Sequence, residues 1–249
     1  MITWAKWSDE KTQGLLTFPV SNPPNRDKLK NEVFAMIMDI IQTKTNFNLA
    51  WDVISRGKKI ADADAPFIPF MFLAEVRLPD DLRKLIFNPN DTSHGTSLRD
   101  RLTFRLYDKD HEIGSIAGRT QKVNKLFGSY PYYEYVENGE TYLVYEVGFG
   151  MKGLYLCFYK NDSLFCIVEK ELTTVNFKDK YKCYMTDDRY LSVVTAFVIY
   201  YDTVSYGDIL DKAVYSRKKA VVNTYQKELK AKFDPNFIPK IKALEGIDE

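Results

Sequence analysis

The sequence has few of the residues that most often carry catalysis or bind metal ions. Among its 249 residues there are only two histidines, His94 and His111, and three cysteines. Neither type recurs at a spacing typical of metal ligands, and an odd number of cysteines argues against a disulfide framework. We therefore expect reduced, structural thiols, no catalytic residue set, no cofactor and no metal.

Net charge is nearly absent as well. The 35 basic and 34 acidic residues leave a formal charge of +1, so the whole chain offers no electrostatic field for nucleic acid or a membrane. A charged partner has to meet a local patch. The N-terminal stretch carries Asp9 and Glu10 and has no apolar segment of the secretory kind. These features favour a cytoplasmic protein that does not bind nucleic acid.

No apolar run reaches the length of a membrane span. The most apolar stretch, LSVVTAFVIYY at residues 191–201, is shorter than the ~20 apolar residues that a transmembrane helix needs. Neither the helical nor the strand period picks out a polar face within it, so we expect it to be buried on all sides. Its β-branched residues favour a strand and its length allows a buried helix, and the periodicity leaves both open.

The N-terminal third shows a mixed pattern. Apolar side chains recur at helical spacing over residues 26–42, which predicts a helix. Residues 46–60 and 67–78 are strand-like, and we interpret the Asp-Ala-Asp-Ala-Pro sequence at residues 62–66 as a break between them. Pro79, followed by two aspartates, predicts the first turn of a short helix.

An accumulation of turn formers at residues 88–95 predicts a boundary, beyond which the pattern is that of a β meander. Asn138-Gly139 supplies the positive φ angles of a type I′ hairpin turn, and Asn161-Asp162-Ser163 predicts a further hairpin. The two arms of that hairpin carry Cys157 and Cys166 near the same cross-strand level, where small apolar thiols pack.

A glycine-rich motif at residues 148–153, with Gly148, Gly150 and Gly153, matches the GxGxxG pattern. A dinucleotide site needs a helix after the last glycine, whereas the LYLCFYK that follows predicts a strand. A protein-kinase loop does join two strands, and Lys170 falls about where a phosphate-pairing lysine would. The HRD-x-x-x-x-N and DFG motifs of kinases are absent, however.

The C-terminal part predicts an amphipathic helix over residues 208–233 with one apolar and one basic side. Such a basic face can meet anionic lipid headgroups at roughly 1 kcal/mol per cation near the surface. A solvated helix face is the plainer interpretation. The candidate lipid-contacting residues are Lys212, Arg217, Lys218, Lys219, Lys227, Lys230 and Lys232.

Four ordered motifs of the second half resemble the tubby-like superfamily, in particular the LURP-one-related proteins, with phospholipid scramblases and tubby as more distant members. They are YEVGFGMKG at 145–153, FCIVEK at 165–170, DKYKCY at 179–184 and the apolar run that ends in Tyr200-Tyr201-Asp202. The resemblance implies a β-barrel or curled sheet around a hydrophobic helix formed by residues 191–201. It also implies lipid-linked roles, but no residue matches tubby's basic headgroup pocket.

We therefore predict an α+β protein in three regions. Residues 1–95 form a mixed α/β N-terminal part, residues 96–206 a mostly antiparallel, tubby-like β-barrel or curled sheet around a buried hydrophobic helix, and residues 207–249 a basic helical tail. The expected function is non-enzymatic binding of an anionic lipid, as on an anionic membrane surface, or of a small ligand. The alternatives are a nucleotide-binding enzyme that uses the turn at residues 148–153, and a protein-interaction module.

Overall fold

The structure is a computed structural model. It describes residues 34–45, 48–66, 68, 72–79, 81–87, 103–123, 128–173, 178–205 and 222–247. Residues Val33–Glu249 form one compact unit, and the fold below is that of its described part.

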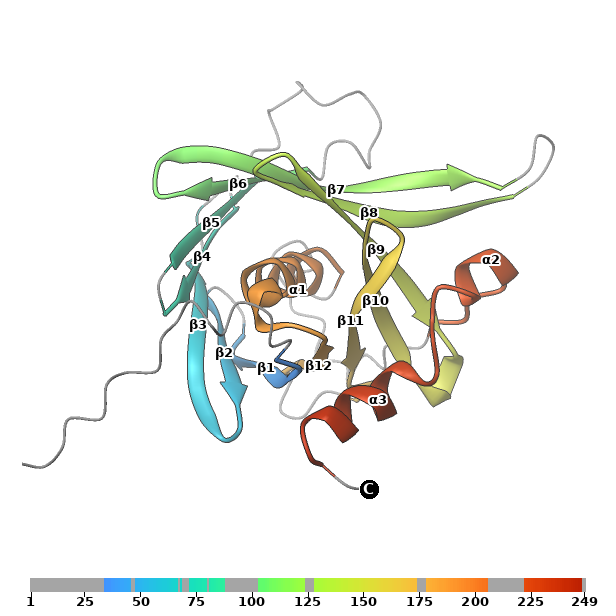
Figure 1. The fold of residues 1–249 in the computed structure, drawn as a ribbon. Helices are drawn as coiled ribbons and strands as arrows, with labels where there is room; N and C mark the ends of the chain where they lie inside the picture. Colours follow the sequence, from blue (N-terminus) through green and yellow to red (C-terminus); the bar gives the residue numbers. More distant parts are fainter. Residues whose placement is uncertain are drawn as a thin grey trace, which may run out of the picture. The chain divides into compact units, whose positions relative to one another are not determined.

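Within these described ranges, twelve antiparallel strands close into a barrel in the order β1-β12-β11-β10-β9-β8-β7-β6-β5-β4-β3-β2 (Figure 1). The strands are β1 (Met36–Lys44), β2 (Asn48–Ser55), β3 (Lys58–Pro66), β4 (Phe72–Leu78), β5 (Asp81–Phe87), β6 (Phe104–Asp108), β7 (His111–Lys122), β8 (Ser129–Glu137), β9 (Glu140–Gly148), β10 (Leu154–Lys160), β11 (Ser163–Lys170) and β12 (Lys180–Met185). The helical elements are η2 (Gly150–Lys152), η3 (Asp188–Tyr190), α1 (Leu191–Ser205), α2 (Lys227–Lys230) and α3 (Phe237–Leu244).

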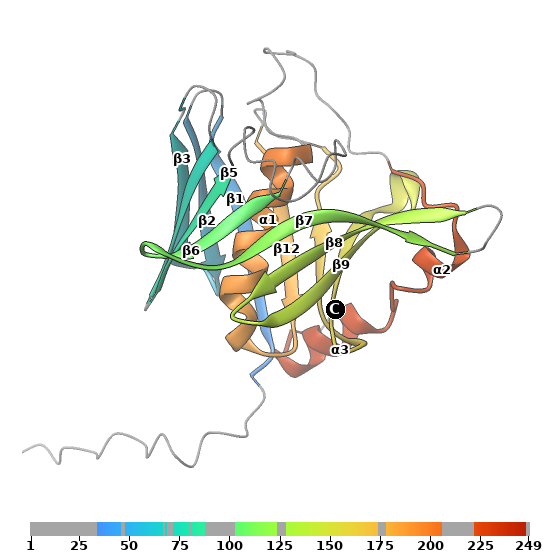
Figure 2. The same cartoon turned by 90° about the horizontal axis from the view of Figure 1, so that it is seen from above.

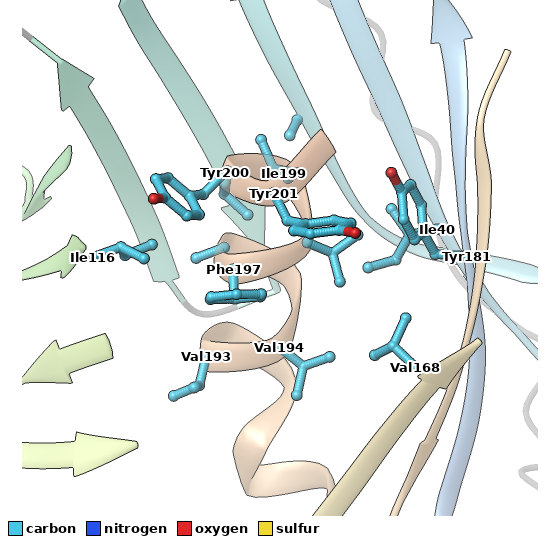
Figure 3. Packing of buried hydrophobic residues seen from close by; sticks show 14 of the residues in the cluster. Ile40, Ile116, Val168, Tyr181, Val193, Val194, Phe197, Ile199, Tyr200 and Tyr201 are labelled. Carbon is cyan, nitrogen blue, oxygen red and sulfur yellow. The ribbon is translucent and has the colours of Figure 1, made fainter. Parts of the chain in front are cut away.

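Helix α1 runs through the inside of the barrel (Figures 1 and 2). Every residue from 193 to 203 is buried, and Phe197 packs its ring 5.1 Å from that of Phe158 on β10. Around the helix, Tyr200 and Tyr201 point towards different strands of the wall (Figure 3). Burial on all sides overrides the β propensity of its branched residues. The prediction of a mostly antiparallel barrel around a buried helix is confirmed.

The turns and cysteines follow the predictions closely. Asn138 and Gly139 join β8 to β9 with φ angles of 50° and 79°, as a type I′ turn requires. The predicted hairpin at Asn161 joins β10 to β11. Cys157 pairs with Ile167 and Cys166 with Phe158, so the two cysteines are one residue apart in register, and Cys157 faces outward while Cys166 faces α1. All three cysteines are free and buried, and burial raises the pKa of each thiol, so they are unreactive packing residues.

The N-terminal expectations need correction. The predicted helix over residues 26–42 is wrong in its described part, because β1 begins at Met36. Met38 and Ile40 face the barrel interior while Ile37 packs on the outside, so the strand is apolar on both sides and lacks the alternation that marks an ordinary strand. Residues 26–33 lie outside the described residues.

Two further N-terminal elements are strands as well. The predicted break at residues 62–66 belongs to β3, where Ala63 and Ala65 face α1 and Asp62 faces out. Pro79 lies at the turn between β4 and β5, so the helix predicted there is also wrong. The described part of residues 1–95 is therefore β1–β5, which close the same barrel as the later strands, and the mixed α/β region is not confirmed.

The predicted helix over residues 208–233 is wrong for residues 222–226, which are extended, and α2 has only four residues. Residues 206–221 lie outside the described residues. From Val222 onward the chain crosses to the outer face of the barrel, where α2 contacts β9 and α3 contacts β12 and β1 (Figures 1 and 2). We call residues 222–247 the C-terminal segment.

Candidate functional site

A layer of polar and ionisable side chains lies inside the barrel around the C-terminal half of α1. Each strand residue in it falls on the inner face, because side chains alternate along a strand and its neighbours two positions away face α1. We call this set the polar layer: Gln42, Trp51, Glu146, Lys170, Asp179, Tyr181, Tyr201 and Asp202.

Asp202 of α1 is the centre of the polar layer and is 1% exposed. The indole of Trp51 donates to its Oδ2 over 2.8 Å, and the hydroxyl of Tyr181 donates to its Oδ1 over 2.6 Å. Burial raises the pKa of Asp202 to about 6; Asp179 adds to this increase, while Lys170 and the two hydrogen bonds oppose it. The helix is thereby tied to β2 and β12 by one titratable carboxyl.

Lys170 is fully enclosed and paired. Its ammonium contacts the carboxylate of Asp179 and lies 4.5 Å from the centre of the Tyr181 ring. The backbone N–H of Asp179 donates to the side-chain oxygen of Gln42 over 3.2 Å. The pair with Asp179 holds the barrel wall together. Because the Lys170 side chain is only 1% exposed, it does not reach a ligand at the surface.

Glu146 of β9 completes the layer by accepting a hydrogen bond from the hydroxyl of Tyr201 over 2.8 Å. Burial raises the pKa of Glu146, and this hydrogen bond opposes the increase. The polar layer therefore contains three carboxyl groups and one lysine, and burial favours the neutral form of two of these carboxyls, those of Glu146 and Asp202. The arrangement can take up and release a proton near α1. Among the described residues, no group of three or more His, Cys, Asp or Glu side chains could hold a metal ion.

The glycine-rich motif forms a tight connection that is occupied by the C-terminal segment. The N–H of Gly150 donates to the carbonyl of Val222 over 2.8 Å, and the N–H of Thr224 donates to the carbonyl of Gly148 over 2.9 Å. The N–H of Gly148 in turn donates to the hydroxyl of Thr224 over 2.9 Å. A strand follows the motif, as predicted, and the amides that would cradle a phosphate at Gly148 and Gly150 are already bonded within the protein.

Two glycines of this motif are required by the close approach of the segment. A Cβ at Gly148 would overlap the carbonyl oxygen of Val222, and a Cβ at Gly150 would lie 2.8 Å from the side-chain oxygen of Asn223. Gly150 also has a φ of +64°, which other residues rarely adopt. The glycine pattern thus serves contact between two backbones.

The candidate lipid-contacting residues separate into two groups. Lys227 and Lys230 are exposed, although the Lys230 ammonium lies 5.9 Å from the centre of the Phe149 ring. Lys232 is half-buried and lies over the rings of Tyr145 and Tyr159, at 4.6 and 5.1 Å from their centres. The remaining four, Lys212, Arg217, Lys218 and Lys219, lie outside the described residues, so their lipid contact stays a prediction.

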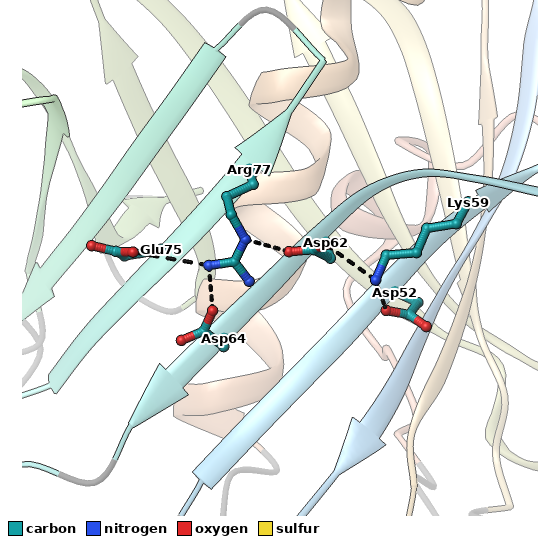
Figure 4. Close-up of polar contacts among 6 residues, drawn as sticks. All are labelled: Asp52, Lys59, Asp62, Asp64, Glu75 and Arg77. Atoms are coloured by element: carbon teal, nitrogen blue, oxygen red, sulfur yellow. Dashed lines mark hydrogen bonds and ion pairs between the residues drawn. The ribbon is translucent and has the colours of Figure 1, made fainter.

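An open cleft of about 430 Å³ lies on the other side of the barrel, at the outer surface of β2–β4. Lys59 bridges Asp52 and Asp62 at 2.8 and 3.1 Å, and Arg77 contacts Asp62 at 2.5 Å and also pairs with Asp64 (Figure 4). Partial burial raises the pKa of Asp62, but the hydrogen bonds from both cations outweigh this and hold it below its usual range. These cations are engaged by carboxylates, which weakens the cleft as a site for an anion.

Sequence reasoning missed the polar layer. Asp202 directly follows the apolar run at residues 191–201, and Lys170 follows the run at residues 164–168 after Glu169; these positions are the one local signal that could have marked them. Their partners could not be found this way, because Trp51 and Asp202 are 151 positions apart in the sequence.

Fold and site together define a class of protein: a closed antiparallel barrel around a buried helix, with a titratable polar layer inside and a peptide segment on its outer face. Comparisons of the chain with family models, curated proteins and solved structures gave no match. No helix among the described residues is long and apolar enough to cross a membrane.

Proposed function

We propose that the chain is a non-enzymatic, tubby-like binding protein that meets an anionic lipid surface with the region around its glycine-rich turn. Support for the tubby-like kind is architectural. A closed antiparallel barrel around a hydrophobic helix is the arrangement that the sequence resemblance implies. Support for binding without catalysis comes from the polar layer, whose ionisable groups are buried and paired with one another.

The observation that carries the lipid proposal is a pair of exposed apolar side chains. Met151 is 62% exposed and Tyr225 is 82% exposed, and both follow within two residues of the backbone pair Phe149–Asn223. Exposed lysines lie near them in the sequence, on the glycine-rich turn and at the start of the C-terminal segment. We call this set the turn patch: Met151, Lys152, Tyr225, Lys227 and Lys230.

Such a combination suits an anionic membrane surface. An aromatic or apolar side chain can enter the boundary between headgroups and acyl chains, while neighbouring lysines remain with the phosphates. Each lysine near the surface contributes roughly 1 kcal/mol, so three of them give weak, salt-dependent binding on their own. The four basic residues at positions 212–219 precede the segment and would add to it.

Sedimentation with vesicles tests the proposal. The protein should pellet with vesicles that contain phosphatidylserine at low salt, less so at physiological salt, and not with purely zwitterionic vesicles. A variant with Lys152→Glu, Lys227→Glu, Met151→Ser and Tyr225→Ser should lose this binding. The triple variant Arg217→Glu, Lys218→Glu, Lys219→Glu should weaken it.

The matched control is Lys58→Glu with Lys109→Glu, because both lysines are exposed but lie on β3 and on the β6–β7 turn. It should bind as the parent does. Equal binding to both vesicle types, or to neither, contradicts the proposal. Thermal shift with ATP and magnesium addresses the nucleotide alternative, since a ligand at 100 times its dissociation constant adds ~2.7 kcal/mol. A protein-interaction module would respond to none of these additions.

A further inference from the structure

The C-terminal segment contacts the barrel in the manner of a bound peptide. Its first residues pair with the turn after β9 through two backbone hydrogen bonds, Gly150 to Val222 and Thr224 to Gly148. Extended peptides commonly bind by adding such a ladder to exposed backbone. The absence of a side chain at Gly148 is what permits the approach, since a Cβ there would overlap the Val222 carbonyl.

After this short ladder, apolar anchors hold the segment on the outer face of the barrel. Leu229, Phe237 and Ile241 are 4%, 6% and 0% exposed, although they lie in or beside the short helices α2 and α3. Phe233 adds ring contacts at 4.5 Å to Tyr155 and 5.3 Å to Phe149. The residues that receive the anchors are Tyr130, Tyr145, Val147, Cys157, Ile167 and Tyr184.

Polar contacts fix the position of the segment between its anchors. The hydroxyl of Tyr159 donates to the carbonyl of Lys232 over 2.8 Å, and the Lys232 ammonium lies over the Tyr145 and Tyr159 rings. Near its end, Glu245 pairs with Arg56 at 2.9 Å. These side-chain contacts accompany the backbone hydrogen bonds, as contacts that give specificity do in a bound peptide.

The barrel does not need the segment for closure. The strand order runs from β1 through β12 back to β2 without any of residues 222–247. The buried cluster around α1 shares no residue with the cluster under the segment, among the residues that the structure describes. The segment therefore covers a wall that is complete on its own.

We propose that the turn at residues 148–153 and the outer face of β8–β12 form a peptide-binding site, and that its ligand is the chain's own C-terminal segment, which detaches as a unit while the barrel stays closed. The ligand class is an extended stretch followed by short amphipathic helices with large apolar anchors. This inference does not rest on the lipid-binding proposal, since it concerns the buried side of the segment.

A release variant of the full chain tests detachment. Leu229→Asp, Phe237→Asp and Ile241→Asp place charges at the three buried anchors, and the matched control Lys227→Asp, Asn236→Asp and Lys240→Asp places them at exposed positions of the same segment. In hydrogen exchange followed by mass spectrometry, the segment of the release variant should exchange like an unfolded chain. Its β11, β12 and α1 peptides should keep the protection that they have in the control.

A labelled peptide of the unaltered residues 222–247 then tests the site itself. It should bind the release variant saturably and the control at least tenfold more weakly, because the control's site is filled. Adding Gly148→Val to the release variant should weaken peptide binding at least tenfold. Adding Gly118→Val should not, because a Cβ at Gly118 meets no atom within 4 Å.

Two results would overturn the inference. One is loss of protection in β11, β12 and α1 together with the segment, which would make the segment an integral part of the barrel. The other is a released segment whose empty site does not bind the peptide. In the otherwise unaltered chain, Gly148→Val should also raise exchange at residues 222–224 relative to Gly118→Val, and equal exchange in the two variants would contradict the inference independently.

Discussion

The inner and outer surfaces of the barrel are covered in different ways. Inside, α1 meets a continuous shell of side chains from strands around the barrel, and its Tyr201 and Asp202 are hydrogen-bonded to the wall. Outside, the C-terminal segment covers β8–β12 and β1, whereas the outer surface of β2–β4 carries exposed ion pairs. From this difference we expect that the interior packing keeps the barrel closed, and that changes in the outer layer leave the barrel closed.

A charge in the interior should have the largest effect. Val194 and Phe197 are fully buried on α1, so Val194→Asp or Phe197→Asp places an unpaired carboxylate in a filled core. This costs several kcal/mol against a total stability of ~5–15 kcal/mol, and we expect unfolded protein. Circular dichroism during heating measures it. Leu244→Asp on the outer layer, where the side chain is 62% exposed, is the control and should melt like the parent.

If either interior variant kept the parent melting temperature, α1 would not be the core. A charge inside the barrel would then cost no more than a charge on its outer layer.

Removing the buried cation should have the next largest effect. Lys170→Met leaves Asp179 and Asp202 without their positive neighbour inside the barrel, and breaking such a pair costs about 3–5 kcal/mol. Urea unfolding at neutral pH measures the loss. The double variant Lys170→Met with Asp179→Asn should recover part of it, because the uncompensated charge is gone. A change below about 1 kcal/mol in the single variant would mean that the polar layer does not hold the wall.

Asp202 gives the interior a pH dependence that the outer ion pairs do not share. Its pKa is raised to about 6 in the folded protein from an ordinary value of 3.8, so its stabilising contribution is full below pH 3.8 and is lost as the pH rises through 6. Between pH 5 and pH 7 the loss is about 1 kcal/mol. Asp202→Asn should lower stability at every pH but remove this slope.

The measurement is the free energy of unfolding in urea for the parent and for Asp202→Asn at several pH values. The difference between them should shrink as the pH rises from 5 to 7. A difference that is constant over this range would contradict the raised pKa.

The ion pairs on the outer surface of β2–β4 should matter least. Arg77 is partly exposed and contacts Asp62 and Asp64, and such surface pairs contribute within ~1 kcal/mol and are screened by salt. Arg77→Ala should therefore change the free energy of unfolding by less than about 1 kcal/mol, and by still less at 1 M salt. A loss comparable to that of Lys170→Met would place part of the barrel's stability on its outer surface.

The same contrast explains what the sequence could predict. Short-range chemistry was sufficient for the hairpin turns at Asn138 and Asn161, because positive φ angles demand particular residues locally. It failed for β1, because both faces of this strand are packed against other parts of the protein. Apolar and polar residues therefore do not alternate along it. It failed again for β3, because alternating alanine and aspartate are typical of a loop in an isolated sequence. In the structure the alanines pack against α1, which makes the segment a strand with one buried face.

The helical state of α1 followed only from the family resemblance, since its residues favour a strand locally and burial decides between the two. The polar layer was beyond prediction because its partners come from distant strands. For the glycine motif, the sequence suggested only a nucleotide as the partner of the turn. The structure places the segment that begins at Val222 there, and no local signal in the sequence marks that distant segment as the partner.

Native-state hydrogen exchange of the unaltered protein tests most directly whether the outer layer is separable from the barrel. The amides of Gly150 and Thr224 join the segment to the turn, and the central amides of β11 and β12 belong to the closed wall. We expect the first pair to exchange through a local opening at least about 2 kcal/mol below the global free energy of unfolding, and the wall amides to exchange only through global unfolding. Exchange of both sets with the same free energy and the same dependence on denaturant would contradict the account, because barrel and segment would then open as one unit.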